Sequence, residues 1–309
     1  MSATTKISWA DSTINAWTVC TERSAGCQNC FARELAKRYG WGNGWGKGVP
    51  RHKFKGAMKN LAWMNKHWLV CDKCGSPVFN NGDCKCGSVG AGENKGHARR
   101  IFHGDLCDIF DEEAPIELLA EWLDGMRLAD RCTNLLCTKR PENFFPLFDT
   151  LRRLNKKFIT EETRAWVDRW MNAACDPPPP ANIILLTSVE NQAMADKRIP
   201  ELLKIPAACR GLSLEPLMGP VDLMKVKTGS TKFQDGWALG IGIDWLIIGC
   251  ESGPRRRPCN LEWIESLVEQ GLEAGVPVWV KQISMDGKVE TDMSKFPKHL
   301  QIREWPKGF

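Results

Sequence analysis

The 309-residue sequence contains no run of eighteen apolar residues, the length that a membrane-spanning helix requires. Its first ten residues also lack the apolar stretch of a secretory signal. The five histidines form neither a catalytic-triad pattern nor a metalloprotease motif. We therefore expect a cytoplasmic protein with no membrane partner.

Cysteine, in contrast, is abundant, with fourteen copies. Disulfides are rare in the reducing cytosol, and a chain of this length buries enough apolar surface to fold without them. Clustered cysteines in such a chain indicate metal binding. The net charge of +5 is modest, and basic clusters such as Arg255-Arg256-Arg257 fit either an anionic partner or a solvated surface.

Seven short apolar runs recur along the chain, and each is followed by polar or charged residues. Such runs without alternation are typical of parallel strands covered on both faces. The predicted strands are 16–19, 100–103, 134–137, 182–186, 211–214, 244–248 and 277–280. Helical spacing predicts helices at 115–130, 141–154, 161–172, 191–204 and 260–274. This alternation predicts an α/β fold, namely a complete or partial TIM-type (β/α) barrel over residues 1–309.

The polar residues that follow the strands share one expected location, because barrels of this kind place their active sites at the carboxyl ends of the strands. Contact with solvent also explains a polar residue at any one strand end. The set as a whole nevertheless predicts a functional rim. Its members are Cys20, Asp105, Lys139, Arg140, Glu190, Asn191, Glu215, Glu251, Ser252, Lys281 and Gln282.

Cys20, Cys27 and Cys30 directly follow the first predicted strand. Three thiolates are one short of a closed zinc site and one short of the usual four-cysteine iron-sulfur cluster. A 4Fe-4S cluster held by three cysteines leaves one iron open, and S-adenosylmethionine can bind that iron through its amino and carboxylate groups. A structural zinc site with a borrowed fourth ligand and unligated thiols remain alternatives.

Several ordered blocks of the sequence carry a resemblance to a known family. They include residues 15–20 (NAWTVC), 26–32 (GCQNCFA), 102–110 (FHGDLCDIF), 137–144 (CTKRPENF), 187–203 (TSVENQAMADKRIPELL), 212–223 (LSLEPLMGPVDL), 244–258 (DWLIIGCESGPRRRP) and 274–282 (AGVPVWVKQ). The chain resembles bacteriophage-borne radical-SAM-like proteins with a three-cysteine motif, which are similar to spore photoproduct lyase. The resemblance implies a barrel, an iron-sulfur cluster on Cys20, Cys27 and Cys30, and a bacterial host cell as location.

Four further cysteines, Cys71, Cys74, Cys84 and Cys86, lie in a glycine-rich insertion at 71–96 that has little apolar material. Tetrahedral zinc would supply the folding energy that this segment lacks, so we expect a small zinc-knuckle-like module. A second iron-sulfur cluster and free thiols are the alternatives. We expect the insertion to lie beside the rim, where Lys73 and Lys85 could contact nucleic acid.

The leading hypothesis is a radical S-adenosylmethionine enzyme that modifies or repairs a nucleic-acid base or nucleotide and needs an external electron donor. Its candidate catalytic residues are Glu190, Glu215, Glu251 and Lys281. Its candidate cofactor-binding residues are Asp105, Lys139, Arg140, Asn191, Ser252 and Gln282. The rival is a non-catalytic nucleic-acid-binding protein whose cluster and zinc are structural or redox-sensing.

Overall fold

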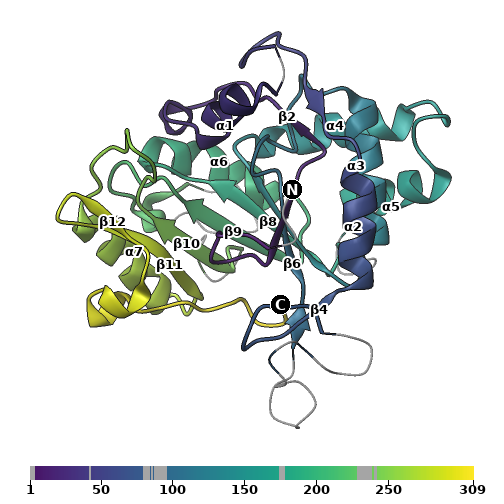
Figure 1. Ribbon diagram of the computed structural model, residues 1–309. Helices are drawn as coiled ribbons and strands as arrows, with labels where there is room; N and C mark the ends of the chain where they lie inside the picture. The colour runs from purple at the N-terminus through teal and green to yellow at the C-terminus, as the bar shows by residue number, and fades with distance from the viewer. Residues whose placement is uncertain are drawn as a thin grey trace.

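A computed structural model describes residues 4–41, 43–78, 84, 86, 96–173, 178–227, 239 and 242–309. Its centre is a sheet of eight strands in the order β1-β6-β7-β8-β9-β10-β11-β12 (Figure 1). The strands are β1 (Ser12–Ile14), β6 (Arg100–His103), β7 (Thr133–Thr138), β8 (Ile183–Ser188), β9 (Cys209–Leu214), β10 (Trp245–Gly249), β11 (Val278–Met285) and β12 (Lys288–Glu290). Only β12 runs antiparallel to its neighbour, so the α/β class with a mostly parallel sheet is confirmed.

The strands follow one another in sequence order across the whole sheet. Sequential order is the connectivity of a singly wound barrel, whereas a doubly wound sheet reverses its order at a switch point. Within the described residues β1 and β12 are the two edges of the sheet, so the strands that are seen do not close a ring. The geometry therefore establishes an α/β sheet without establishing barrel closure.

The predicted first strand is wrong in position. Residues 16–19 contain only β2 (Trp17–Thr18), which pairs antiparallel with β3 (His52–Lys53) outside the main sheet. The parallel strand is β1, whose sequence Ser-Thr-Ile is too polar and too short to stand out as an apolar run. The buried Arg99 guanidinium donates to Ser12 Oγ at 2.9 Å, which satisfies one of these polar side chains inside the fold. The other six predicted strands are confirmed, with shifted ends.

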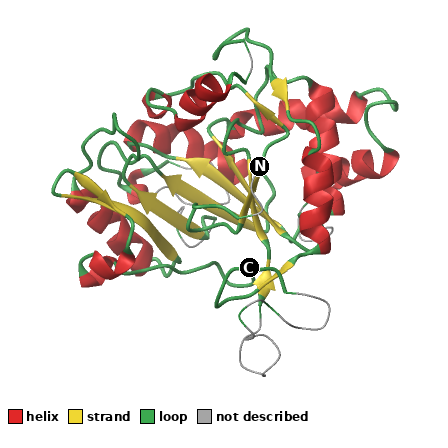
Figure 2. Ribbon diagram, viewed as in Figure 1, coloured by secondary structure: helices red, strands yellow, loops and turns green. Residues whose placement is uncertain are grey.

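Most of the helices, drawn red in Figure 2, pack against one face of the sheet through a single large core, to which the first helix does not belong. The main ones are α1 (Phe31–Tyr39), α2 (Ala57–Lys66), α3 (Ile116–Leu128), α4 (Phe144–Arg153), α5 (Glu161–Met171), α6 (Gln192–Lys204) and α7 (Leu261–Glu273). Side-chain N-caps start three of them, because Thr160, Asn191 and Asn260 each accept a hydrogen bond from a backbone N–H of the first turn. One large core fills the space between helices and strands, including Trp122 and Trp170 as expected for tryptophans at helical spacing.

The opposite face of the sheet is closed by a cluster of tryptophans. Trp245 of β10 lies 4.6 Å from Trp305 and 6.4 Å from both Trp9 and Trp279, measured between ring centroids. Trp9 precedes β1 and Trp305 follows the last strand, so both ends of the described chain pack on this face. The indole of Trp279 also donates to Ser8 Oγ at 3.1 Å. The cavity described below opens at the carboxyl end of this face, next to Trp9.

The cysteine-rich insertion is attached at the amino end of the sheet. The two-stranded ribbon of β4 (Leu69–Val70) and β5 (His97–Ala98) leads directly into the start of β6, and Figure 1 shows β4 far from α1. The expectation that this module lies beside the rim is therefore wrong. Residues 79–83, 85 and 87–95 of the insertion, Lys85 among them, lie outside the described residues.

Candidate functional site

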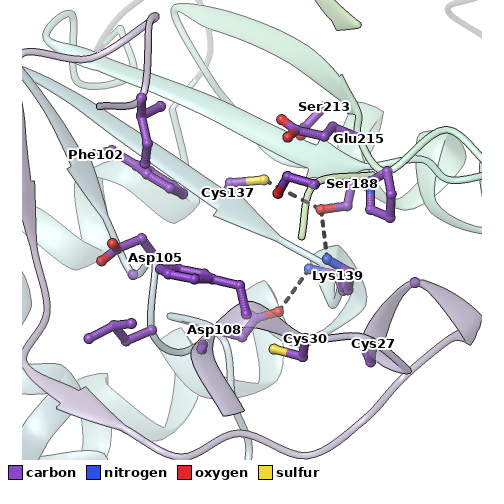
Figure 3. A pocket seen from close by; sticks show the side chains of 18 of the residues that line it. Cys27, Cys30, Phe102, Asp105, Asp108, Cys137, Lys139, Ser188, Ser213 and Glu215 are labelled. Carbon is purple, nitrogen blue, oxygen red and sulfur yellow. Dashed lines mark hydrogen bonds between the residues drawn. The ribbon is translucent and has the colours of Figure 1, made fainter. Parts of the chain in front are cut away.

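A cavity of about 520 Å³ opens at the carboxyl ends of the parallel strands. Its lining combines the cysteine loop after β2 with the ends of β6 to β11, which come from distant parts of the chain (Figure 3). The predicted site residues that line it are Cys20, Cys27, Cys30, Asp105, Lys139, Glu215, Glu251, Ser252, Lys281 and Gln282. The polarity of the strand ends predicted this shared location for all of them except Cys27 and Cys30, which were predicted from the three-cysteine pattern.

The cysteine loop enters the cavity through an unusual backbone conformation. Val19, directly before Cys20, is fully buried and has a φ of 79°, a left-handed value that a β-branched residue rarely adopts. Such strain persists where the surrounding structure imposes it, and it is common at functional sites. The buried neighbours of Val19 thus fix the direction in which Cys20 leaves the strand.

Backbone N–H groups surround the other two thiols of this loop. The N–H of Arg23 donates to Cys27 Sγ at 3.4 Å, and Cys30 is the residue that precedes α1. Burial raises the pKa of Cys30, while the N–H groups of Arg33 and Ala32 in the first helical turn oppose that rise. Hydrogen bonds of this kind stabilise a metal-bound thiolate.

Glu190 lies beneath the cysteine loop instead of in the cavity lining. Its carboxylate is fully buried, forms an ion pair with Arg198 at 2.7 Å, and accepts a hydrogen bond from Ser24 Oγ at 2.6 Å. A Cβ atom at Gly26 would lie 2.4 Å from Glu190 Oε1, so only glycine fits there. The contacts of Glu190 support the loop that carries Cys27.

Arg140 is also buried behind the loop. Its guanidinium forms an ion pair with Asp111 at 2.7 Å and donates to Cys20 Sγ at 3.5 Å and to the Thr21 carbonyl oxygen at 2.6 Å. Burial raises the pKa of the Cys20 thiol to about 12, although the positive charge of Arg140 acts in the opposite direction. The third predicted residue outside the lining is Asn191, which caps α6 by accepting from the N–H of Met194 at 3.1 Å.

Lys139 places a positive charge inside the cavity. Its Nζ donates to Ser188 Oγ at 3.2 Å, and its backbone N–H donates to Asp108 Oδ2 at 2.8 Å, as Figure 3 shows. Burial lowers the pKa of Lys139, but the charge of Glu190 and the nearby thiols outweigh this and raise it. Lys139 is therefore an ammonium ion beside the cysteine loop.

The opposite wall of the cavity carries an ion pair between Glu215 and Lys281. Glu215 directly follows β9, and Lys281 lies on β11. The Gln282 side chain donates to the Cys250 carbonyl oxygen at 2.6 Å and so links the ends of β10 and β11. Burial raises the pKa of Asp105, whose carboxylate accepts from Asn15. Charges of both signs thus face the cavity, which suits a zwitterionic ligand.

Glu251 joins the loop after β10 to the cysteine loop. It accepts hydrogen bonds from the Arg257 backbone N–H at 2.7 Å and from Asn29 Nδ2 at 3.3 Å. Arg257 in turn donates to the Ala25 carbonyl oxygen at 2.8 Å. Although burial raises the pKa of Glu251, the hydrogen bonds from Arg257 hold it below its usual value. The ionised Glu251 carboxylate thus connects the loop after β10 to the cysteine loop through hydrogen bonds.

The sequence prediction missed several residues of the lining. Phe102, Asp108, Cys137, Ser188 and Ser213 project from β6 to β9 or follow them directly. The alternation of side chains along a strand was the available clue. Every second residue points to the same face of the sheet, so those near the carboxyl end on the cavity face were candidates for the lining. Lys6 and Trp9 also line the cavity, and they come from the N-terminal segment, to which the sequence prediction assigned no site residue.

The second cysteine group forms a set that can hold a metal ion such as zinc. The Sγ atoms of Cys71, Cys74, Cys84 and Cys86 all lie within 4.8 Å of one another, with separations from 3.0 to 3.9 Å for the pairs in contact. Four thiolates bound to one zinc ion lie about 3.8 Å apart, whereas a disulfide joins its sulfurs at about 2.05 Å. The spacing therefore fits one tetrahedral ion.

His97 links this module to the edge of the main sheet. Its two ring nitrogens lie 2.6 Å from Asp72 Oδ1 and 3.0 Å from Asp11 Oδ2. Burial lowers the pKa of His97, but the carboxylates outweigh this and raise it above its usual value. Asp11 also accepts from the Arg100 backbone N–H at 2.8 Å, so the module is tied to the start of β6.

The fold and site define an α/β protein with a cysteine-lined cavity at the carboxyl ends of its parallel strands and a four-cysteine metal set at the other end. Residues 4–307 match the family described as "Protein of unknown function (DUF5131)", and the chain belongs to this family. No curated protein and no solved structure matches the chain significantly. In the described part of the chain, no helix is both long enough and apolar enough to cross a membrane.

Proposed function

We propose that the chain is a radical S-adenosylmethionine enzyme that acts on a nucleic-acid base or nucleotide, built on a partial TIM-type barrel. The observation that carries the proposal is the shared cavity, which joins Cys20, Cys27 and Cys30 to the charged ends of the parallel strands. A purely structural cluster would not need an open cavity with charges of both signs around it.

The spacing of the three cysteines favours a cluster over a single ion. Among the described residues, the group with single-ion spacing is the Cys71 set, to which these three cysteines do not belong. A four-iron cube separates its thiolate ligands more widely than one ion does, because the irons and sulfides stand between them. The N–H groups of Arg23 and Arg140 that point at sulfur supply the surrounding hydrogen bonds that such clusters need.

When bound, a reduced cluster would give one electron to S-adenosylmethionine, which cleaves to methionine and a 5'-deoxyadenosyl radical that takes a hydrogen atom from the substrate. The chain's own residues provide complementary charges for the zwitterionic cofactor. The Lys139 ammonium suits its carboxylate, and the Asp105 and Glu215 carboxylates suit its amino group or ribose hydroxyls. Trp9 and Phe102 form an apolar wall that excludes water.

The decisive experiment is anaerobic reconstitution of the full chain with iron and sulfide, followed by reduction and assay for 5'-deoxyadenosine. We expect cofactor cleavage, a change in the electron spin resonance of the cluster on adding S-adenosylmethionine, and loss of both in Cys27→Ser. Cys259→Ser is the matched control, because Cys259 is buried, and its Sγ–H contact with the Asn260 carbonyl oxygen at 3.8 Å is one a hydroxyl can replace.

A filled cluster that neither responds to the cofactor nor cleaves it would refute the enzyme proposal. That result would favour the non-catalytic alternative, in which the cluster and the zinc are structural or redox-sensing parts of a nucleic-acid-binding protein. If Cys27→Ser bound as much iron as the parent chain, Cys27 would not be a cluster ligand. The three-cysteine cluster would then be refuted for the enzyme and for the non-catalytic alternative.

A further inference from the structure

Helix α1 exposes large apolar side chains beside the mouth of the cavity. Phe31 and Tyr39 are 54% and 57% exposed, and Leu35 lies between them at a spacing of four residues. The buried side of the helix is formed by Ala32 and Ala36, and ion pairs of Arg33 with Glu22 and of Glu34 with Arg255 also hold it. The exposed rings therefore contribute little to the fold, and exposed aromatic surface of this kind marks an interaction site.

The aromatic surface continues from the helix to the cavity. The Tyr39 ring stacks on Trp41 with a centroid distance of 5.0 Å and an interplanar angle of 23°. Trp41 meets Phe54 edge to face at 5.2 Å, which fixes the position of its indole. Phe31 and Trp45 themselves line the cavity. Flat rings thus lie both along α1 and at the entrance to the proposed site.

Positive charges accompany these rings. Arg38 shares the helix face of Phe31 and Tyr39, and Lys37 projects from the neighbouring exposed side of the helix. Both are exposed, and neither forms an ion pair with any residue that the structure describes. The Arg38 guanidinium lies 5.7 Å from the centroid of the Tyr39 ring. Lys6, another exposed cation, lines the cavity. We call Phe31, Leu35, Lys37, Arg38 and Tyr39 the α1 strip.

We propose that the α1 strip binds single-stranded nucleic acid, with bases stacked on Tyr39 and Phe31 and phosphates held by Lys37 and Arg38. Aromatic platforms flanked by cations are what a single strand requires, because every base offers a flat face and every linkage a negative charge. A duplex hides its base faces, and an apolar protein partner would have to desolvate the two cations. The further step, delivery of one base into the cavity, rests on the proposed function.

The test measures binding of fluorescently labelled fifteen-residue oligothymidylate and oligouridylate, and of a matched duplex, to the reconstituted full chain by anisotropy. Tyr39→Ala should weaken single-strand binding about tenfold, as expected for loss of one stacked base. Replacing both Lys37 and Arg38 with glutamine should reduce the slope of log affinity against log salt by about 1.4. Phe158→Ala is the matched control, because Phe158 is 41% exposed and lies beside Lys157 in the loop between α4 and α5.

Absence of oligonucleotide binding, tighter binding of the duplex, or an equal loss in Phe158→Ala would each overturn the proposal. Self-association that is abolished by Tyr39→Ala, without oligonucleotide binding, would assign the strip to a protein partner instead. The proposed function is tested separately, because the Tyr39 and Lys37/Arg38 variants leave every cavity-lining residue in place. Binding to the strip in a protein that never cleaves S-adenosylmethionine would support the strip and refute the enzyme.

Discussion

Arg140 Nη2 donates to Cys20 Sγ at 3.5 Å and to the Thr21 carbonyl oxygen at 2.6 Å, while Nη1 forms an ion pair with Asp111 at 2.7 Å. The guanidinium is fully buried, and its partners lie on two segments of the chain, one at Cys20 and Thr21 and one at Asp111. Arg51 shares Asp111 and donates to Thr21 Oγ1 at 2.8 Å. The position of the first cysteine thus depends on a buried ionic network behind it.

Replacement of Arg140 by glutamine should lower the free energy of unfolding by about 3 kcal/mol, because it leaves Asp111 buried with only part of its countercharge. Urea unfolding followed by circular dichroism measures this. In a reconstituted protein the midpoint potential of the cluster should also fall, since a donor to sulfur is lost. Arg152→Gln, which removes an exposed pair with Asp168, should cost less than about 1 kcal/mol. If the two variants lost similar amounts of unfolding free energy, the buried ion pair of Arg140 would contribute no more to stability than an exposed one.

Gly26→Ala should displace the cysteine loop, because its Cβ would overlap the Glu190 carboxylate at 2.4 Å and that carboxylate is locked by Arg198. We expect a loss of about 1–3 kcal/mol in stability and a reduced iron content after reconstitution. Gly219→Ala is the control, since its Cβ would meet Asn191 Cβ at an ordinary 3.6 Å. Full iron loading of Gly26→Ala would show that the loop does not need this close approach.

His103 should make the stability depend on pH. It is buried between the Trp122 indole, which donates to Nδ1 at 2.9 Å, and Asn134 Oδ1, 2.8 Å from Nε2. Burial lowers its pKa from 6.5 to about 4. Above pH 6.5 the imidazole is neutral in both states and contributes nothing. As the pH falls from 6.5 towards 4 the unfolded chain takes up a proton that the folded chain refuses, so stability falls by up to about 3 kcal/mol.

Denaturant unfolding at pH 7.5, 6 and 4.5 measures this effect. The comparison is with His103→Gln, which keeps a polar side chain but does not titrate in this range. The variant should be less stable at pH 7.5 and should lose less stability on acidification than the parent chain. Parallel pH profiles for the two proteins would show that His103 is not the group responsible.

The double variant Cys71→Ser, Cys74→Ser should lose about one equivalent of bound zinc, measured by elemental analysis, and should be cleaved faster by protease within residues 71–96. The reason is that the thiolates replace an apolar core in holding the insertion together. Cys132→Ser, at a buried cysteine outside the four-cysteine set, is the control. If the double variant bound as much zinc as the parent chain, these four cysteines would not be the zinc site.

The strand-helix alternation and the polar strand ends were enough to predict most of the parallel sheet and the cavity at its rim. The first strand was misplaced because Ser12 and Thr13 are buried polar residues, which no hydrophobic pattern reveals. Ser12 accepts a hydrogen bond from the distant Arg99. Glu190, Arg140 and Asn191 were assigned to the rim from position alone. In the structure Glu190 forms an ion pair with Arg198, Arg140 forms one with Asp111, and Asn191 caps α6. The polarity of a residue does not reveal which partner it has in the fold.

The two cysteine groups sit at opposite ends of the same strands. The insertion joins the sheet at the amino end of β6, and Asp105 follows the carboxyl end of that strand in the cavity. Four strand residues at about 3.3 Å each separate these ends by roughly 13 Å. Zinc has no accessible redox states, so an ion held there cannot relay electrons. For the proposed enzyme, an external electron donor would therefore need access to the cysteine loop from the cavity side.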